Sequence, residues 1–164
     1  FRSNYAFMHV LGYDAAIYDK ERLNIEAQII DVKVPIIASD ISGKAIENAK
    51  LNALAAGVSE MISFSVCDFY ETHVPEDGAG VMMVNPEYGD RLGDETALEE
   101  TYGRIGDFMK KKCGGYWGYV FTGNLDLAKK IGLKAKRRIE FFNSTIDCRL
   151  LEYELYSGSR RVEK

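Results

Sequence analysis

Short apolar runs alternate with amphipathic helical segments along most of this 164-residue chain. The first clear run, Val34–Ala38, leads into a turn and then into a helical segment that Ser42 can cap and Gly57 can end. Strands that alternate with helices usually pair in parallel, and the helices cover the faces of the sheet. This alternation constrains the chain to an α/β fold.

The same alternation continues to the end of the chain. Two closing strand-like runs, 136–143 and 146–156, are joined by so short a connection that an antiparallel hairpin is favoured. We therefore predict a three-layer α/β fold with a mostly parallel sheet and a C-terminal antiparallel hairpin. The other expected elements are helices at about 14–30, 95–112 and 124–131 and strands at 61–66, 80–84 and 116–121.

Length and charge limit the function. A chain of 164 residues is about one domain's worth of sequence. Its net charge is −4, with 21 basic and 25 acidic residues. This charge argues against nucleic-acid binding that depends on overall basicity. A polyanionic partner must therefore be held by a local patch or by another domain.

The cysteines, the histidines and the hydropathy of the chain indicate its redox compartment and whether it binds a metal or a membrane. The three cysteines, Cys67, Cys113 and Cys148, are far apart and odd in number, so we predict buried thiols in a reducing cytosol rather than disulfides or a zinc site. His9 and His73 have no partner at ligand spacing, and no metal is expected. No apolar run approaches the roughly 18 to 20 residues of a membrane span, so no membrane partner is expected.

Polar side chains end three of the predicted strands: Asp40, Asp68 and Asn85. Ligands of open α/β sheets bind outside the carboxyl ends of the strands. Asp40 suits an acceptor for ribose hydroxyls, or alternatively a carboxylate that serves its own turn. Asp68, beside the aromatic Phe69, suits an acceptor for the amino group of adenine, or alternatively an ordinary start of a loop.

The most specific feature is Asn85-Pro86-Glu87-Tyr88. It resembles the (Asn/Asp/Ser)-Pro-Pro-(Tyr/Phe/Trp) motif of S-adenosylmethionine-dependent amino-methyltransferases, although the dipeptide Asn-Pro alone is also typical of an ordinary turn. The resemblance implies that the Asn85 side chain and the Pro86 carbonyl accept hydrogen bonds from an exocyclic amine. It also implies that Tyr88 stacks on a flipped base.

The chemistry explains why such a motif is useful. A conjugated amine is a poor nucleophile, because its lone pair is delocalised into the ring. Two acceptors in line draw it toward tetrahedral geometry and aim the lone pair at the methyl group, so positioning supplies much of the rate. Removing a base from its stack costs a few kcal/mol, which stacking on an aromatic ring offsets.

The longer string from Val84 to Leu92 narrows the resemblance. It is similar to the Asn-Pro-Pro-Tyr-Gly-x-Arg-Leu signature of the THUMP-associated RNA methylases, notably the large-subunit ribosomal RNA guanine-N2 methyltransferases. The segments 38–49 and 147–150 resemble the same family. The resemblance implies a Rossmann-like class I methyltransferase fold with S-adenosylmethionine as cofactor. It assigns Asp40, Ile41, Asp68, Phe69 and Asn85 to the cofactor, Asn85, Pro86 and Tyr88 to catalysis, and Tyr88 and Arg91 to the substrate.

Two departures from the family pattern stand out. Glu87 replaces the second proline, which removes a ring that would stiffen the loop. The family's first strand and its Asp-Pro-x-Cys-Gly-Ser-Gly motif do not occur in the sequence. We therefore expect residues 1–164 to be a C-terminal part of the catalytic domain, with the cofactor motif and a THUMP-like RNA-binding domain upstream.

The function expected from the sequence is methylation of an RNA amino group in the cytoplasm, most specifically guanine N2 of large-subunit ribosomal RNA. DNA adenine-N6 methylation is one alternative, because the short motif also serves that reaction. A non-catalytic binding or scaffold domain is a second alternative, favoured by Glu87 and by the missing glycine motif. A dehydrogenase is more distant, because no GxGxxG is present.

Overall fold

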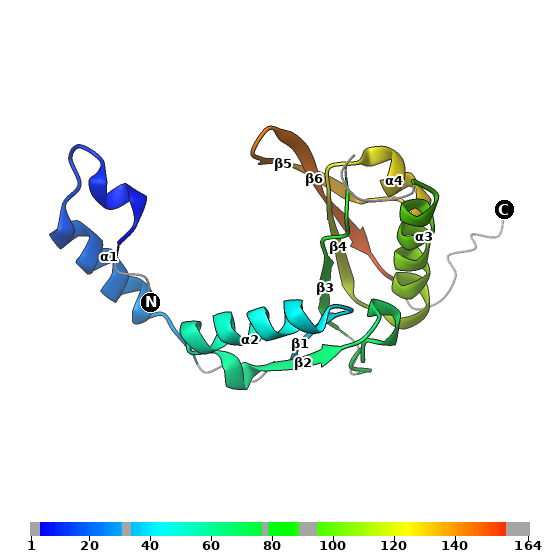
Figure 1. The fold of residues 1–164 in the computed structure, drawn as a ribbon, viewed down its shortest axis with the longest axis horizontal. Helices are drawn as coiled ribbons and strands as arrows, with labels where there is room; N and C mark the ends of the chain where they lie inside the picture. Colours follow the sequence, from blue (N-terminus) through cyan, green and yellow to red (C-terminus); the bar gives the residue numbers. More distant parts are fainter. Residues whose placement is uncertain (1–3, 31–33, 77–78, 89–94, 157–164) are drawn as a thin grey trace. The chain divides into compact units, whose positions relative to one another are not determined.

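The computed structural model describes residues 4–30, 34–76, 79–88 and 95–156. The chain forms two compact units, residues 1–72 and residues 73–164. Figure 1 labels the helices and strands in chain order. Within the described ranges, no helix is both long enough and apolar enough to cross a membrane.

The described part of the first unit alternates helices and strands. Its elements are the 3₁₀ turn η1 (Ala6–His9), helix α1 (Ala15–Glu26), strand β1 (Ile36–Asp40), helix α2 (Gly43–Ala56), the turn η2 (Ser59–Met61), strand β2 (Ile62–Val66) and the turn η3 (Phe69–Glu71).

Local hydrogen bonds set the ends of these helices. The carboxylate of Asp14 accepts from the N–H of Ala16 (2.8 Å) at the start of α1, and the hydroxyl of Ser42 accepts from the N–H of Ala45 (3.3 Å) at the start of α2. Helix α2 ends at Gly57, whose φ of 73° lies in the left-handed region. The caps at Ser42 and Gly57 are the ones that the sequence predicts.

Strands β1 and β2 form a parallel pair, with Asp40 opposite Val66. Helix α2 connects the two strands and packs on both, and its buried residues are Ile46 and Ala53. Because the strands are parallel and in register, their carboxyl ends lie at one edge of the pair. The polar residues that follow both strands are therefore neighbours at that edge.

The second unit contains a four-stranded sheet with the strand order β3-β4-β6-β5. Strands β3 and β4 are parallel, whereas β6 runs antiparallel to both β4 and β5. The described elements are β3 (Val81–Val84), α3 (Glu95–Lys112), β4 (Trp117–Thr122), α4 (Leu125–Lys130), β5 (Arg137–Asn143) and β6 (Ile146–Glu154).

The core of the second unit lies between the sheet and helix α3. A Cβ atom placed on Gly118 of β4 would lie 3.1 Å from the terminal methyl carbon of Met109, so the helix packs directly on the strand. Along β4, every second residue is buried, as expected for a strand covered on one face. The buried side chains from helix and sheet include Tyr102, Ile105, Phe108, Met109, Val120, Leu151 and Tyr153.

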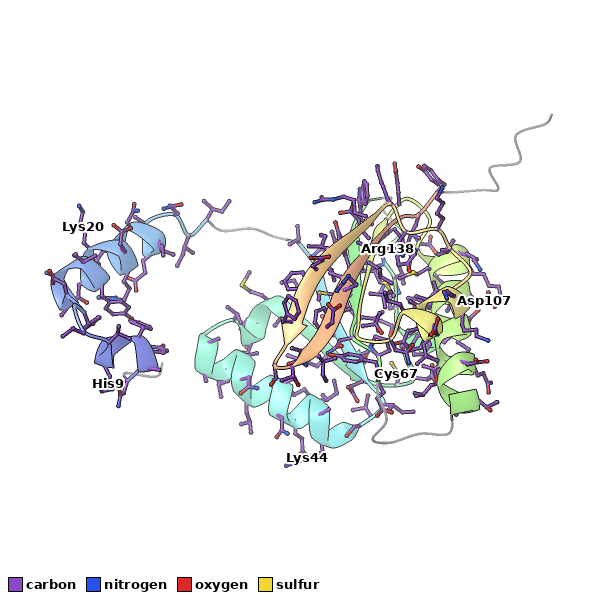
Figure 2. The ribbon with its side chains drawn as sticks, turned by 90° about the horizontal axis from the view of Figure 1, so that it is seen from above. His9, Lys20, Lys44, Cys67, Asp107 and Arg138 are labelled. Carbon is purple, nitrogen blue, oxygen red and sulfur yellow. The ribbon has the colours of Figure 1, made fainter. Side chains whose placement is uncertain are left out.

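The outer side of α3 is charged. Asp107, labelled in Figure 2, lies on this side and pairs with Lys111 at 3.1 Å and with Lys110 at 4.0 Å. Lysines in the last turn also suit the negative end of the helix dipole. The lysine run therefore has a structural explanation within the helix.

The predicted α/β class, the parallel strand pairs and the terminal hairpin are confirmed. Strand β1 begins at Ile36 instead of Val34, because Pro35 has no N–H to donate to a ladder. The strand also extends beyond Ala38, so that Asp40 is its last residue. Antiparallel pairing also extends further than the hairpin, since β6 pairs with β4 as well.

The cysteines are free thiols. Cys113 and Cys148 are buried as predicted, with no exposed surface. Cys67 is only half-buried, because it follows β2 at the open edge of the strand pair. The prediction of a buried thiol was wrong at this position.

Candidate functional site

Two carboxylates lie at the carboxyl edge of the β1–β2 pair. Asp40 is the last residue of β1, and Asp68 follows the end of β2 by two residues. The Asp40 carboxylate accepts from the N–H of Ser42 (2.7 Å), and the Asp68 carboxylate accepts from the N–H of Tyr70 (2.9 Å). Each carboxylate thus shapes its own turn. A carboxylate accepts several hydrogen bonds, so this duty is compatible with binding a ligand as well.

Apolar side chains flank these carboxylates in sequence. Ile41 directly follows β1 and is 76% exposed. Phe69 begins the turn η3, where its ring lies 6.5 Å from the ring of Tyr70 in an edge-on arrangement. The edge of the first unit therefore carries hydrogen-bond acceptors with apolar surface beside them, which is the composition of a small-molecule site.

The Asn85-Pro86 motif lies at the corresponding edge of the second unit. It follows β3 directly, and Gly123 and Asn124 follow the parallel strand β4. Asn85 is exposed and Pro86 is half-buried. The motif that the sequence singles out is therefore at the accessible end of its strand, where the fold class places ligands.

Buried hydroxyls anchor the loop that carries this motif. Tyr102 of α3 donates from its hydroxyl to the carbonyl of Glu87 (3.3 Å) and lies 2.7 Å from the hydroxyl oxygen of Thr122. The N–H of Asn124 donates to the Thr122 hydroxyl (3.0 Å). The Thr122 hydroxyl also lies 3.3 Å from the carbonyl oxygen of Asn124, and these contacts link the end of β4 to the loop.

This network bears on the missing second proline. The side chain of Glu87 is exposed, while its carbonyl is held by Tyr102. Burial raises the pKa of Tyr102, opposed by its hydrogen bond with Thr122, so the phenol stays protonated and keeps its donor. A tertiary hydrogen bond therefore restrains the loop at the position where the family's proline ring would stiffen it.

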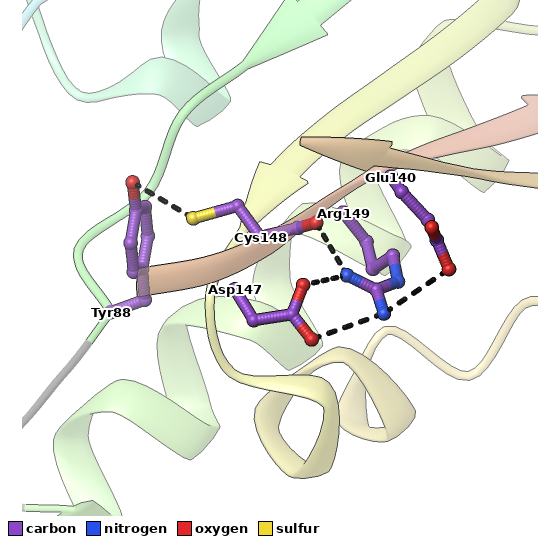
Figure 3. A network of polar contacts seen from close by, with 5 residues as sticks. All are labelled: Tyr88, Glu140, Asp147, Cys148 and Arg149. Carbon is purple, nitrogen blue, oxygen red and sulfur yellow. Dashed lines mark hydrogen bonds and ion pairs between the residues drawn. The ribbon is translucent and has the colours of Figure 1, made fainter. Parts of the chain in front are cut away.

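The side chain of Tyr88, in the same loop, packs against the sheet. Its ring stands edge-on to Phe121 of β4, with centroids 6.1 Å apart. Its hydroxyl accepts from the side-chain amide of Asn143 (3.2 Å) and from the thiol of Cys148 (3.8 Å), as Figure 3 shows for the thiol. Tyr88 is half-buried.

A charged cluster stabilises the strand behind Cys148. Arg149 pairs with Asp147 and with Glu140 at 3.6 Å, and Figure 3 shows both contacts. Arg149 also donates to the carbonyl of Cys148 (2.8 Å). The hydrogen bond that Arg149 donates to the Asp147 carboxylate, more than any other contact, raises the pKa of Arg149. The cluster fixes the backbone that carries the Cys148 thiol.

The predicted site residues fall into two groups by unit. Asp40, Ile41, Asp68 and Phe69 lie at the edge of the first unit, and Asn85, Pro86 and Tyr88 lie at the edge of the second. Arg91 lies outside the described residues. Among the residues that the structure does describe, no group of three or more His, Cys, Asp or Glu side chains could hold a metal ion.

Sequence reasoning missed Tyr102, Gly123 and Asn143. In the sequence, Tyr102 is one more apolar position on the face of a helix. The sequence does not indicate which partner its hydroxyl would bond when it is buried. Asn143 reads as a turn residue. No sequence signal pairs either of them with the Asn85–Tyr88 loop.

The family model described as "RMKL-like, methyltransferase domain" matches residues 2–152. This chain belongs to the RMKL-like methyltransferase domain family. Ribosomal RNA large subunit methyltransferase K/L of Shewanella baltica is 32% identical over 166 residues, an alignment that covers 98% of this chain and 23% of the relative. The sequence resemblance to large-subunit ribosomal RNA methyltransferases is thereby confirmed, and the chain spans about a quarter of the curated relatives' length.

Solved structures agree with this family assignment. SMU.472, which was crystallised with S-adenosylhomocysteine (SAH), has a TM-score of 0.78 at 22% identity, covering 95% of this chain and 41% of that one. A Listeria monocytogenes protein named as a predicted N6-adenine-specific DNA methylase has a TM-score of 0.70 at 29% identity, covering 87% and 36%. The Rossmann-like methyltransferase fold of this RMKL-like chain is confirmed.

Proposed function

We propose that this chain is part of an S-adenosylmethionine-dependent RNA methyltransferase that acts on an exocyclic amino group, namely guanine N2 of large-subunit ribosomal RNA. The observation that carries the proposal is the Asn85-Pro86-Glu87-Tyr88 loop at the carboxyl end of β3, with its backbone anchored by Tyr102. The name of the Shewanella baltica relative supports ribosomal RNA as the substrate.

The residues of the first unit fit the cofactor. S-adenosylmethionine carries its methyl group on a positively charged sulfur, which makes the methyl group an electrophile. Asp40 accepts hydrogen bonds from the ribose hydroxyls, and Asp68 accepts from the amino group of adenine. Ile41, which is 76% exposed, and Phe69 contact the apolar faces of the adenosine. The SAH complex of SMU.472 supports this choice of cofactor.

The residues of the second unit fit the target amine. The side-chain oxygen of Asn85 and the carbonyl of Pro86 accept the two amino protons, and the family resemblance also assigns Asn85 to cofactor binding. Tyr88 stacks on the flipped base. Arg91 contacts an RNA phosphate. The pull of two acceptors on the amine raises its nucleophilicity without a strong base.

Recognition of the whole RNA is assigned to a separate domain. The net charge of −4 makes the 164-residue chain a poor polyanion binder by itself. A THUMP-like domain upstream of residues 1–164, the partial catalytic domain, would supply that affinity. The free thiols fit a reducing cytoplasm.

A methyl-transfer assay tests the proposal. The full gene product is incubated with radiolabelled S-adenosylmethionine and with ribosomal RNA, DNA or protein, and the methylated nucleoside is identified by mass spectrometry. We expect label on guanine N2 in RNA, and we expect Asn85→Ala to reduce the rate at least 100-fold, because one of two acceptors is lost. The matched control is Asn52→Ala, at an exposed position of α2, with an unchanged rate.

Other outcomes would overturn the proposal. Transfer to adenine in DNA but not to RNA would favour the alternative that the Listeria monocytogenes structure suggests by its name. No heat on calorimetric titration with S-adenosylmethionine would favour a non-catalytic scaffold. Equal rates for Asn85→Ala and Asn52→Ala would remove the motif from catalysis.

A further inference from the structure

The ring of Tyr88 rests on the backbone of Gly123, just past the end of β4. A Cβ atom placed on Gly123 would stand 2.8 Å from ring carbon Cδ2 of Tyr88 and 2.8 Å from a methyl carbon of Ile146. Side chains do not approach this closely, so the position of the ring requires a residue without a side chain beneath it. Gly123 has no positive φ that would by itself demand glycine, which leaves packing as the reason.

The hairpin holds the other end of the same ring. Asn143, the last residue of β5, donates to the Tyr88 hydroxyl at 3.2 Å, and Cys148 of β6 approaches the hydroxyl at 3.8 Å. The ring of Phe121 stands edge-on to the ring of Tyr88. Phe121 also stands edge-on to Phe141 of β5, and the centroids of these two phenylalanine rings are 5.9 Å apart. The ring is thus contacted below by Gly123, at its edge by Phe121 and at its hydroxyl by the hairpin.

We propose that Gly123 and Asn143 are positioning residues that set the orientation of the base-stacking ring of Tyr88. This inference rests on the proposed function, in which Tyr88 stacks on the target base. Tyr88 is three residues from Asn85 in one loop, so the plane of its ring determines where the target amine stands relative to the two acceptors. A misplacement of about 1 Å can cost up to about 100-fold in rate.

The steric part is tested with Gly123→Ala in the full gene product. The added methyl group displaces the Tyr88 ring, and we expect kcat on RNA to fall at least tenfold while KM for RNA changes less than threefold. The affinity for SAH and the thermal midpoint stay close to wild type, because Tyr88 is only half-buried and swings toward solvent. The matched control is Gly103→Ala, where the nearest atom to the new methyl is the Lys130 carbonyl oxygen at 3.9 Å. Equal kcat values for the two variants would overturn the inference.

The polar part is tested with a double-mutant cycle, which remains informative if Gly123→Ala fails to fold. Asn143→Ala and Tyr88→Phe each remove one partner of the same hydrogen bond, and we expect each to lower kcat about threefold to tenfold. The double variant should match Tyr88→Phe alone, because no bond is left to lose. Multiplicative losses, or an unchanged kcat for Asn143→Ala, would contradict a positioning role.

Failure of the inference is distinguishable from failure of the proposed function. If wild type methylates RNA and Asn85→Ala is inactive while Gly123→Ala and Asn143→Ala keep full kcat, the proposed function stands and the inference is wrong. If wild type transfers no methyl group to RNA, the proposed function is wrong, and the inference is overturned with it.

Discussion

Tyr102 links the body of helix α3 to the loop that carries the Asn85-Pro86 motif. Its side chain has no exposed surface, and its hydroxyl contacts both the Glu87 carbonyl and the Thr122 hydroxyl. A buried hydroxyl whose partner is removed is left unsatisfied, at a cost of about 1–3 kcal/mol. A single oxygen atom at residue 102 therefore contributes to both stability and loop geometry.

Tyr102→Phe is expected to lower the free energy of unfolding by about 1–2 kcal/mol, because the hydrogen bonds of the Tyr102 hydroxyl with Thr122 and with the Glu87 carbonyl are lost. It should also lower kcat on RNA, since the Glu87 carbonyl is released. Denaturant titration and methyl-transfer kinetics measure the two effects. The control is Tyr119→Phe, which removes the hydrogen bond from Tyr119 to Glu152 (3.1 Å) without touching the loop. A loss of kcat as large in the control would show that Tyr102 acts through general stability alone.

At the scale of elements, helix α3 contains two glycines with opposite surroundings. A methyl group on Gly103 would have no atom closer than the Lys130 carbonyl oxygen at 3.9 Å, whereas one on Gly106 would clash with the backbone carbonyl of Ile131. Helix α3 therefore lies directly against the C-terminal end of α4 at Gly106. Substituting alanine at each of these two positions therefore separates the effect of helix propensity on stability from the effect of helix packing.

Gly103→Ala is expected to stabilise the protein by about 0.5–1 kcal/mol, because alanine loses less backbone entropy in a helix. Gly106→Ala is expected to destabilise it by about 1–3 kcal/mol, because α4 must move away from α3. Urea unfolding monitored by circular dichroism measures both. Stabilisation by both substitutions would mean that the two helices do not pack closely at Gly106.

At the scale of the whole molecule, the second unit buries weakly acidic groups in its core. Burial raises the pKa of Cys113 from 9.0 to about 11 and that of Tyr153 from 10.0 to about 12. Both groups are neutral in the folded state at a pH where the unfolded chain already ionises. Their contribution to stability is therefore complete below about pH 9 and is lost as the pH rises toward 12.

The urea midpoint of unfolding is accordingly expected to be steady from pH 7 to 9 and to fall between pH 9 and 12. Cys113→Ala should reduce the slope between pH 9 and 11, the interval between the ordinary and the raised pKa of this thiol. Cys67→Ala is the matched control, because it removes a thiol that is only half-buried; a change of slope as large as that of Cys113→Ala would show that burial of Cys113 is not the cause. A wild-type urea midpoint that stays constant up to pH 11 would contradict the conclusion that these buried groups make stability depend on pH.

Local interactions explain what could be read from the sequence alone. The caps at Ser42 and Gly57 follow from contacts within a few residues, so the α/β class and most elements were predictable. The Asn85-Pro86-Glu87-Tyr88 motif was found in the same way, because its specificity lies in four consecutive residues.

Tertiary structure decided what surrounds that motif. Tyr102 and Glu87 are 15 residues apart, and Tyr88 and Asn143 are 55 residues apart. The contact between Tyr88 and Asn143 depends on the position of β6 between β4 and β5, which brings the hairpin beside the end of β4. Strand order is selected by the packing free energy of the whole sheet and not by local preference. The sequence by itself therefore determined the reactive loop, and the fold determined the residues that hold it in place.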